Sequence, residues 1–278
     1  MQYWLLARFD KPIGILILLW PTLWALWIAG NGHPDTLVLI VFCLGVVLMR
    51  AAGCVINDYA DKDFDPHVAR THLRPIAAGK VKPKEALAVF CLLCLTSFAL
   101  VLLMNWYTIA LSFIGAFLAA SYPFMKRYTH LPQAYLGMAF GFAIPMAFAA
   151  QTGSIPLVAW ILYLAVLLWA LVYDTMYAMV DIEDDLKIGI KSTAILFGRR
   201  VREITAGLQA VILLLLITVG AILDLEWPYY AGLCIAGCLS IYQQTLIFNY
   251  HKPDCFKAFL NNNWYGLAVF AGLVIAYW

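Results

Sequence analysis

TLVLIVFCLGVVLMRAAGCVINDYADKDFDP, residues 36–66, is the stretch that decides the fold. Its first part, residues 36–57, is predominantly apolar and long enough to cross a bilayer, which takes about 20 helical residues. Four aspartates follow within residues 58–65. Carboxylates this close repel one another unless a cation lies between them. The stretch therefore predicts a membrane-spanning helix that ends in an acidic, cation-binding segment at the membrane surface.

The composition of the whole chain extends this interpretation. Of its 278 residues, 64% are hydrophobic and only 12% are charged, whereas a soluble domain has about 25% charged residues. The mean hydropathy is +0.84. Nine apolar segments are candidate spans: 12–29, 36–57, 85–104, 108–125, 133–150, 156–178, 204–223, 229–248 and 262–277. We therefore predict an all-α, polytopic membrane protein with nine transmembrane helices, in which residues 1–278 form one domain.

The basic residues test this topology independently. Of the 18 lysines and arginines, all except Arg50 lie in the N-terminal segment or in every second connection between spans. Arg50 lies inside a predicted span, close to the start of one of these connections. The opposite connections, at 29–35, 104–108, 150–155 and 223–229, contain none. By the positive-inside rule, the N-terminus and the basic loops are cytoplasmic and the C-terminus is periplasmic. A bacterial inner membrane is the expected location.

A second acidic cluster follows the sixth predicted helix. It is YDTMYAMVDIEDDLKIGIKSTA, residues 173–194. An even number of crossings separates it from the first cluster, so both lie on the same side of the membrane. Of the 16 acidic residues in the chain, four lie within 58–65 and five within 174–185. The two clusters are therefore expected to meet at the cytoplasmic face.

The spacing within the clusters indicates a metal site. Asn57, Asp61 and Asp65 stand at i, i+4 and i+8, and Asp181 and Asp185 at i and i+4, so each set forms a stripe on one helix face. Hard oxygen ligands suit Mg²⁺, which is commonly held by one or two carboxylates together with substrate phosphates and water. These five residues are the predicted magnesium ligands. The alternative is a pair of solvated acidic loops that end helices.

Cationic side chains belong to the same membrane face. Arg70 and Arg74 follow the first cluster, Lys187 and Lys191 belong to the second, and Lys126 and Arg127 end the fourth predicted helix. Arg50 lies inside a predicted span, where a basic residue is commonly functional or extends to the interface. Carboxylates, Mg²⁺ and basic side chains on one face indicate a phosphate or diphosphate site. For any one of these cations, the alternative role is to set the topology.

At this point the motifs resemble those of a known family. Asn57-Asp58-x-x-Asp61-x-x-x-Asp65 and Asp181-x-x-x-Asp185 resemble the two aspartate-rich motifs of the intramembrane UbiA-type prenyltransferases. Longer blocks are similar to the 4-hydroxybenzoate polyprenyltransferases of ubiquinone biosynthesis: DKPIGILILLWPTLWALW, MRAAGCVINDYAD, YPFMKRYTHLP, YDTMYAMVDIEDDLKIGIKSTAILFG and CFKAFLNNNWYG. The resemblance covers nearly the whole chain.

The resemblance implies a fold and an activity. The fold is a set of nine helices around a central cavity with a cytoplasmic cap. The activity is the Mg²⁺-dependent transfer of a polyprenyl group from its diphosphate to the ring carbon ortho to the hydroxyl of 4-hydroxybenzoate. The implied partners are polyprenyl diphosphate, 4-hydroxybenzoate and the lipid bilayer, and no nucleic acid is expected.

The resemblance and the chemistry together give each residue an expected role. The metal-site positions of the family fall on Asn57, Asp61, Asp65, Asp181 and Asp185, while Asp58 is expected beside that stripe. Arg127 and Arg70 are the preferred contacts of the diphosphate, supported by Arg74, Lys126, Lys187 and Lys191. Arg50 and Arg8 are both candidates for the acceptor carboxylate, because an arginine fork fits a carboxylate. Tyr173, Asp174 and Tyr177 are expected to line the cavity.

Two alternatives stay open from the residues. One is prenyl transfer to a different aromatic acceptor. The other is a divalent-cation or proton-coupled transporter that uses the same acidic helices. Transporters commonly place their coupling carboxylates near the bilayer midplane, whereas here all except Asp174 are predicted at one membrane edge. This placement favours the enzyme.

Overall fold

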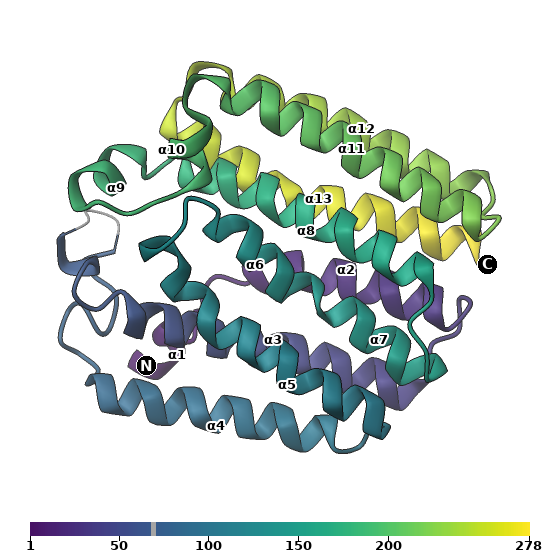
Figure 1. The fold of residues 1–278 in the computed structure, drawn as a ribbon, viewed down its shortest axis with the longest axis horizontal. Coiled ribbons are helices and arrows are strands. Elements are labelled where there is room, and N and C mark those ends of the chain that lie inside the picture. The colour runs from purple at the N-terminus through teal and green to yellow at the C-terminus, as the bar shows by residue number, and fades with distance from the viewer. Residues whose placement is uncertain (68–70) are drawn as a thin grey trace.

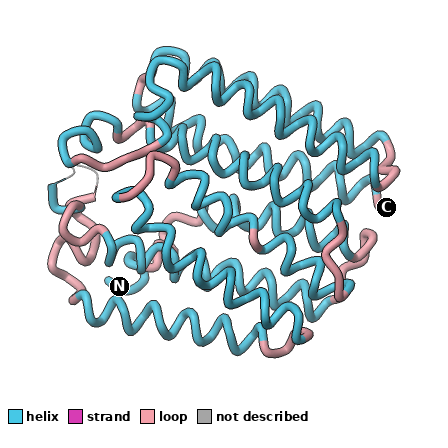
Figure 2. Tube along the Cα trace, in the orientation of Figure 1, coloured by secondary structure: helices cyan, strands magenta, loops and turns pink. Residues whose placement is uncertain are grey.

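The computed structural model describes residues 1–67 and 71–278, and within them it contains helices and no strand (Figures 1 and 2). Arg70, a predicted diphosphate contact, lies outside the described residues. The α-helices are α1 (Gln2–Leu6), α2 (Ile13–Ala29), α3 (Thr36–Ala60), α4 (Pro83–Val101), α5 (Trp106–Ser121), α6 (Pro132–Gly141), α7 (Ala143–Thr152), α8 (Leu157–Ala178), α9 (Ile182–Ile188), α10 (Thr193–Phe197), α11 (Val201–Ile222), α12 (Trp227–Leu246) and α13 (Lys252–Ala276). Short 3-10 helices are η1 (Asp65–His67), η2 (Tyr122–Arg127), η3 (Gly198–Arg200) and η4 (Ile247–Asn249).

The predicted spans are found in this helical order. In the described residues, eight helical stretches are long and apolar enough to cross a membrane: Thr36–Ala60, Pro83–Val101, Trp106–Arg127, Pro132–Thr152, Leu157–Ala178, Thr193–Ile222, Trp227–Asn249 and Lys252–Ala276. The first predicted span forms the shorter apolar helix Ile13–Ala29, which has 17 residues. The all-helical membrane fold is confirmed, and the count of nine crossings stays a prediction.

One boundary differs clearly from the expectation. The last helix begins at Lys252, well before the predicted start at residue 262. Its first turns contain Lys252, Asp254 and Lys257, and a run of asparagines follows at 261–263. A hydropathy pattern places the start of a span at the apolar segment, whereas the backbone hydrogen bonds of the helix continue through these polar turns.

The asparagine run fixes α13 against other helices. Trp169 on α8 donates its indole N–H to the side-chain oxygen of Asn262 at 2.8 Å, and Trp20 on α2 donates to Asn263 at 2.9 Å. Inside an apolar bundle these groups must find protein partners. The polar residues in this span therefore hold α13 in register with α2 and α8.

One span is broken between α6 and α7. Pro145 lacks the N–H that would continue the α-helical bonds, and the chain turns at Phe142. Before the break, α6 packs closely on α8, because a Cβ atom added at Gly137 would lie 2.5 Å from the carbonyl oxygen of Leu167. Gly137 and Gly141 therefore act as a small-residue packing motif between two helices.

The connections gather at two opposite ends of the bundle (Figure 1). The N-terminus, α9 and α10 lie at one end, and the C-terminus lies at the other. The segments that carry the two acidic clusters share the end that holds the N-terminus. This grouping brings together parts of the chain that are more than a hundred residues apart.

Candidate active site

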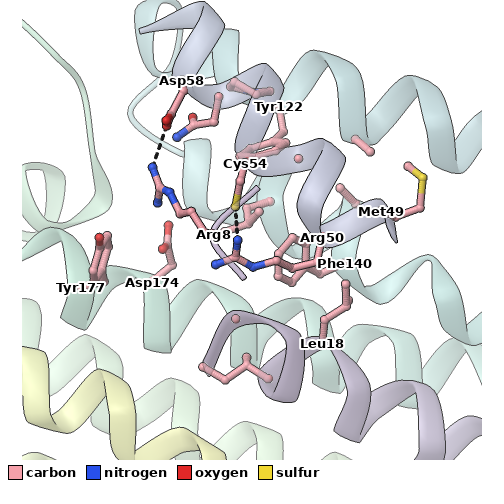
Figure 3. Close-up of a pocket in the computed structure, with 18 of the residues that line it drawn as sticks. Arg8, Leu18, Met49, Arg50, Cys54, Asp58, Tyr122, Phe140, Asp174 and Tyr177 are labelled. Carbon is pink, nitrogen blue, oxygen red and sulfur yellow. Dashed lines mark hydrogen bonds and ion pairs between the residues drawn. The ribbon is translucent and has the colours of Figure 1, made fainter. Parts of the chain in front are cut away.

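A cavity of about 990 Å³ opens beneath this end of the bundle. It is lined by thirteen of the predicted residues: Arg8, Arg50, Asn57, Asp61, Asp65, Arg74, Lys126, Tyr173, Asp174, Tyr177, Asp181, Asp185 and Lys191. Figure 3 shows Arg8 and Arg50 at this cavity, with Asp174 and Tyr177 on α8 on another side of it. Both acidic clusters and most of the predicted cations therefore share one chamber.

The first acidic stripe has the predicted helical geometry. The backbone N–H of Asp61 donates to the carbonyl of Asn57 at 2.9 Å, and that of Asp65 donates to the carbonyl of Asp61 at 2.8 Å. These i to i+4 bonds carry the helical path beyond the end of α3, so the three side chains stand on one face. Lys126 Nζ lies 2.5 Å from Asp61 Oδ2, and Arg74 Nη1 lies 2.9 Å from Asp65 Oδ2.

Asp58 lies beside the stripe and is almost fully buried, with 1% exposure. Arg8 Nη2 donates to its Oδ1 at 2.7 Å, and Arg74 Nη1 lies 3.3 Å from the same atom. Arg8 has a left-handed backbone, with φ of 54°, which is uncommon for a residue other than glycine. The Asp58 carboxylate therefore holds the end of α1 against α3.

The second stripe is built by the turn that opens α9. The backbone N–H of Asp185 donates to the carbonyl of Asp181 at 2.9 Å, so these two residues are one helical turn apart. The chain then returns toward η2, where the backbone N–H of Lys191 donates to the carbonyl of Lys126 at 3.1 Å. This contact ties the second acidic segment to the cation that pairs with Asp61.

The oxygen atoms of the site fit a magnesium ion. Asp61 Oδ1 is buried and has no hydrogen-bond partner among the described residues. Among the described residues, no group of three or more His, Cys, Asp or Glu side chains is placed to hold a metal ion. Mg²⁺ commonly takes one or two carboxylates and completes its shell with substrate phosphates and water.

Burial also affects the first acidic cluster electrostatically. Burial raises the pKa of Asp65, whereas the adjacent Arg74 guanidinium opposes that rise. Neighbouring carboxylates raise the pKa of Asp65 further. A buried carboxylate whose pKa is raised in this way gains from any additional cation, which is the electrostatic condition for metal binding.

A family model described as the UbiA prenyltransferase family matches residues 18–271. This chain belongs to the UbiA prenyltransferase family. It is 70% identical over 275 residues to the 4-hydroxybenzoate octaprenyltransferase of Methylococcus capsulatus, covering 99% of this chain and 94% of that protein. The membership confirms the resemblance predicted from the sequence blocks.

Solved structures of homologues have the same fold. The apo structure of a UbiA homolog from Aeropyrum pernix matches with a TM-score of 0.82 at 24% identity, over 93% of this chain and 97% of that one. A UbiA homolog from Archaeoglobus fulgidus bound to DMAPP and Mg²⁺ matches with a TM-score of 0.68 at 19% identity, over 97% and 99% of the two chains.

Two predicted residues of this UbiA-family chain lie outside the cavity lining. Arg127 is exposed, donates to the carbonyl of Ala60 and lies over the ring of Phe64, 5.2 Å from its centroid. Lys187 is exposed and pairs with Asp184 at 3.3 Å. Arg127 therefore caps the end of α3, and a diphosphate contact by either residue stays a prediction.

The deep part of the polar chamber contains Arg50. Its guanidinium donates to the Cys54 thiol one turn along α3. It also packs directly on α2, because a Cβ atom added at Gly14 would lie 2.5 Å from Arg50 Nε. Sequence reasoning did not single out Gly14 or Tyr122 as lining residues, although both belong to the blocks that resemble the family. The only available signal was their place in those blocks.

Proposed function

We propose that this chain is a 4-hydroxybenzoate polyprenyltransferase of ubiquinone biosynthesis. It transfers a polyprenyl group from polyprenyl diphosphate to the ring carbon ortho to the hydroxyl of 4-hydroxybenzoate. The observation that carries the proposal is the meeting of Asp61, Asp65, Asp181 and Asp185 in one cavity whose remaining wall is largely apolar. The name of the Methylococcus capsulatus relative supports the acceptor and the long donor.

The polar end of the cavity suits a diphosphate. Asn57, Asp61, Asp65, Asp181 and Asp185 are the residues that would hold Mg²⁺. When bound, the ion neutralises the charge that develops on the leaving diphosphate. Lys126 lies 2.5 Å from the Asp61 carboxylate, and Arg74 lies 2.9 Å from the Asp65 carboxylate. Both cations can therefore also donate to the oxygens of a diphosphate held beside these aspartates.

The acceptor carboxylate is assigned to Arg50 rather than Arg8. Arg8 is engaged by the buried Asp58 at 2.7 Å, whereas Arg50 makes no ion pair with any described residue. Arg50 stands seven positions before Asn57, about 10 Å along the helix from the metal end. An aromatic acid held by Arg50 would place its ring between the arginine and the diphosphate.

The reaction requires protection of an allylic cation. The carbon–oxygen bond breaks and its electron pair leaves with the diphosphate. The ring carbon of the acceptor forms the new carbon–carbon bond, and its proton then passes to the released diphosphate. The cavity excludes bulk water from this cation. Tyr173 and Tyr177 line the wall, and aromatic rings placed beside a cation stabilise its positive charge.

A direct assay tests the proposal. Purified protein in lipid nanodiscs is incubated with Mg²⁺, 4-hydroxybenzoate and a series of prenyl diphosphates, and the products are identified by mass. We expect Asp61→Ala and Asp181→Ala to lower the rate by at least a hundredfold, in the range found for loss of one transition-state contact. Asp63→Ala and Asp184→Ala, in the same acidic segments but outside the cavity lining, are the matched controls.

Two results would overturn this assignment. Full activity of a folded Asp61→Ala variant would refute the assignment of Asp61 as a magnesium ligand. Binding of diphosphate without product from any aromatic acceptor would favour the transporter, which is then tested by Mg²⁺ and proton flux in proteoliposomes.

The orientation is part of the same proposal. The end that contains the acidic clusters faces the cytoplasm of a bacterium, and the C-terminus faces the periplasm, because every basic loop belongs to that first end. An alkaline phosphatase fused at the C-terminus should be active, since the enzyme matures in the periplasm. An inactive, stably expressed fusion would reverse the orientation.

A further inference from the structure

One face of α3 lines the cavity along almost its full length. Val41, Gly45 and Met49 stand at i, i+4 and i+8, and the same face continues through Arg50 to Asn57. From Val41 to Asn57 the face covers about 24 Å at 1.5 Å per residue, against a hydrocarbon core about 30 Å thick. The cavity therefore runs from the polar site deep into the bundle.

The lining changes in character at Arg50. Between Val41 and Met49, the α3 residues that line the cavity are apolar. Phe98 of α4 and Gly115 and Ala116 of α5 line the same part of the cavity. We call this part, bounded by α3, α4, α5 and α7, the apolar arm. The residues of α5 that face it are small, which keeps the arm open.

Gly45 faces open space in the apolar arm. A Cβ atom added there would meet no atom within 4 Å, whereas one added at Gly115 would contact Phe142 at 3.3 Å. A glycine inside a helix is less stable than alanine, and no close contact of an added Cβ atom accounts for this one. Gly45 is thus a position where a Cβ atom meets no neighbour and where a larger side chain would narrow the arm.

With the isoprenoid tail of the donor in the apolar arm, we propose that Gly45 is a specificity-determining residue that sets the tail length the enzyme accepts. The inference rests on the proposed function. Gly45 lies twelve positions from Asn57, about 18 Å along α3. A dimethylallyl group ends near the diphosphate, whereas a long polyprenyl tail must pass Gly45.

The test compares Gly45→Phe with a matched control, Gly207→Phe. Gly207 also sits within a helix and faces open space, but it is exposed on α11 and outside the cavity lining. Each nanodisc sample receives Mg²⁺, 4-hydroxybenzoate and either dimethylallyl diphosphate or octaprenyl diphosphate. We expect Gly45→Phe to lower kcat/KM for the octaprenyl donor at least tenfold relative to the dimethylallyl donor, and Gly207→Phe to leave that ratio unchanged.

Gly45→Ala and Gly45→Leu complete the series and keep the test valid if the phenylalanine variant fails to fold. The donor ratio should fall progressively with side-chain size. An unchanged ratio in folded, active variants would overturn the inference, and so would an equal loss with both donors. Wild-type protein that prenylates no acceptor would instead refute the proposed function, so the two failures are distinguishable.

Discussion

Gly14→Ala should weaken acceptor binding without weakening the fold. The added methyl carbon would lie 2.5 Å from both Nε and Nη2 of Arg50 and 2.9 Å from Cζ. These atoms form the end of a flexible side chain, so the guanidinium moves and the backbone stays. Because alanine also lowers the entropy of the unfolded chain, unfolding stability should be unchanged or slightly higher.

The magnitude follows from the geometry. An ordinary carbon contact is about 3.5–4.0 Å, so the guanidinium must move by about 1 Å or more. Arg50 then loses one of two charge-assisted hydrogen bonds to the acceptor carboxylate, worth about 1.5–3 kcal/mol. That loss corresponds to about a 10- to 150-fold rise in the KM for 4-hydroxybenzoate.

Steady-state kinetics with each substrate varied in turn measures this effect. The KM for the prenyl diphosphate should stay within about twofold, since Gly14 is predicted to act through Arg50 alone. Gly207→Ala controls for the added methyl group. In a double-mutant cycle, Gly14→Ala combined with Arg50→Lys should be no worse than Arg50→Lys alone. Independent, additive losses, or equal rises in both KM values, would refute the reasoning.

Three further changes test the packing that positions the site. Asp58→Asn removes the charged partner of Arg8 and should destabilise the protein by about 2–3 kcal/mol. This is below the usual cost of breaking a buried ion pair, because Arg8 keeps some contact with water. An unchanged thermal unfolding midpoint would contradict this expectation. Asn262→Leu leaves the buried indole N–H of Trp169 without its acceptor and should cost about 1–3 kcal/mol in the same thermal assay. Gly137→Ala places a methyl group 2.5 Å from a carbonyl oxygen of α8, so its midpoint should fall while that of a Gly207→Ala control does not.

The acidic stripes were predictable because they depend on local geometry. A period of four residues puts Asn57, Asp61 and Asp65 on one face of any α-helix, and the backbone bonds of the structure confirm that path. The meeting of the two clusters was predictable as well, because counting crossings places both at the same end. Neither inference required knowledge of tertiary packing.

The orientation of individual cations could not be read in this way. Lys126 and Arg127 are adjacent in η2, yet Lys126 lines the cavity and pairs with Asp61, while Arg127 turns outward and caps α3. Neighbouring residues on a helix point in directions about 100° apart. The phase of such a short helix is set by its packing, so its amino-acid pattern alone does not indicate which of the two residues faces the cavity. Gly14 was missed for a related reason, since its role depends on an arginine of another helix.

The ion pairs of the site also explain how one set of cations can serve two purposes. Lys126 and Arg74 stand against aspartates that are almost fully buried, with exposures of 3% and 5%, where unpaired negative charge would be costly. A cation that reaches these carboxylates also reaches the oxygens of a diphosphate held next to them. Donor binding would then exchange one set of charge-assisted bonds for another, so the acidic stripes can remain buried at every stage. This requires cations on flexible stems close to both groups, which is the arrangement that η2 and the loop before α4 provide.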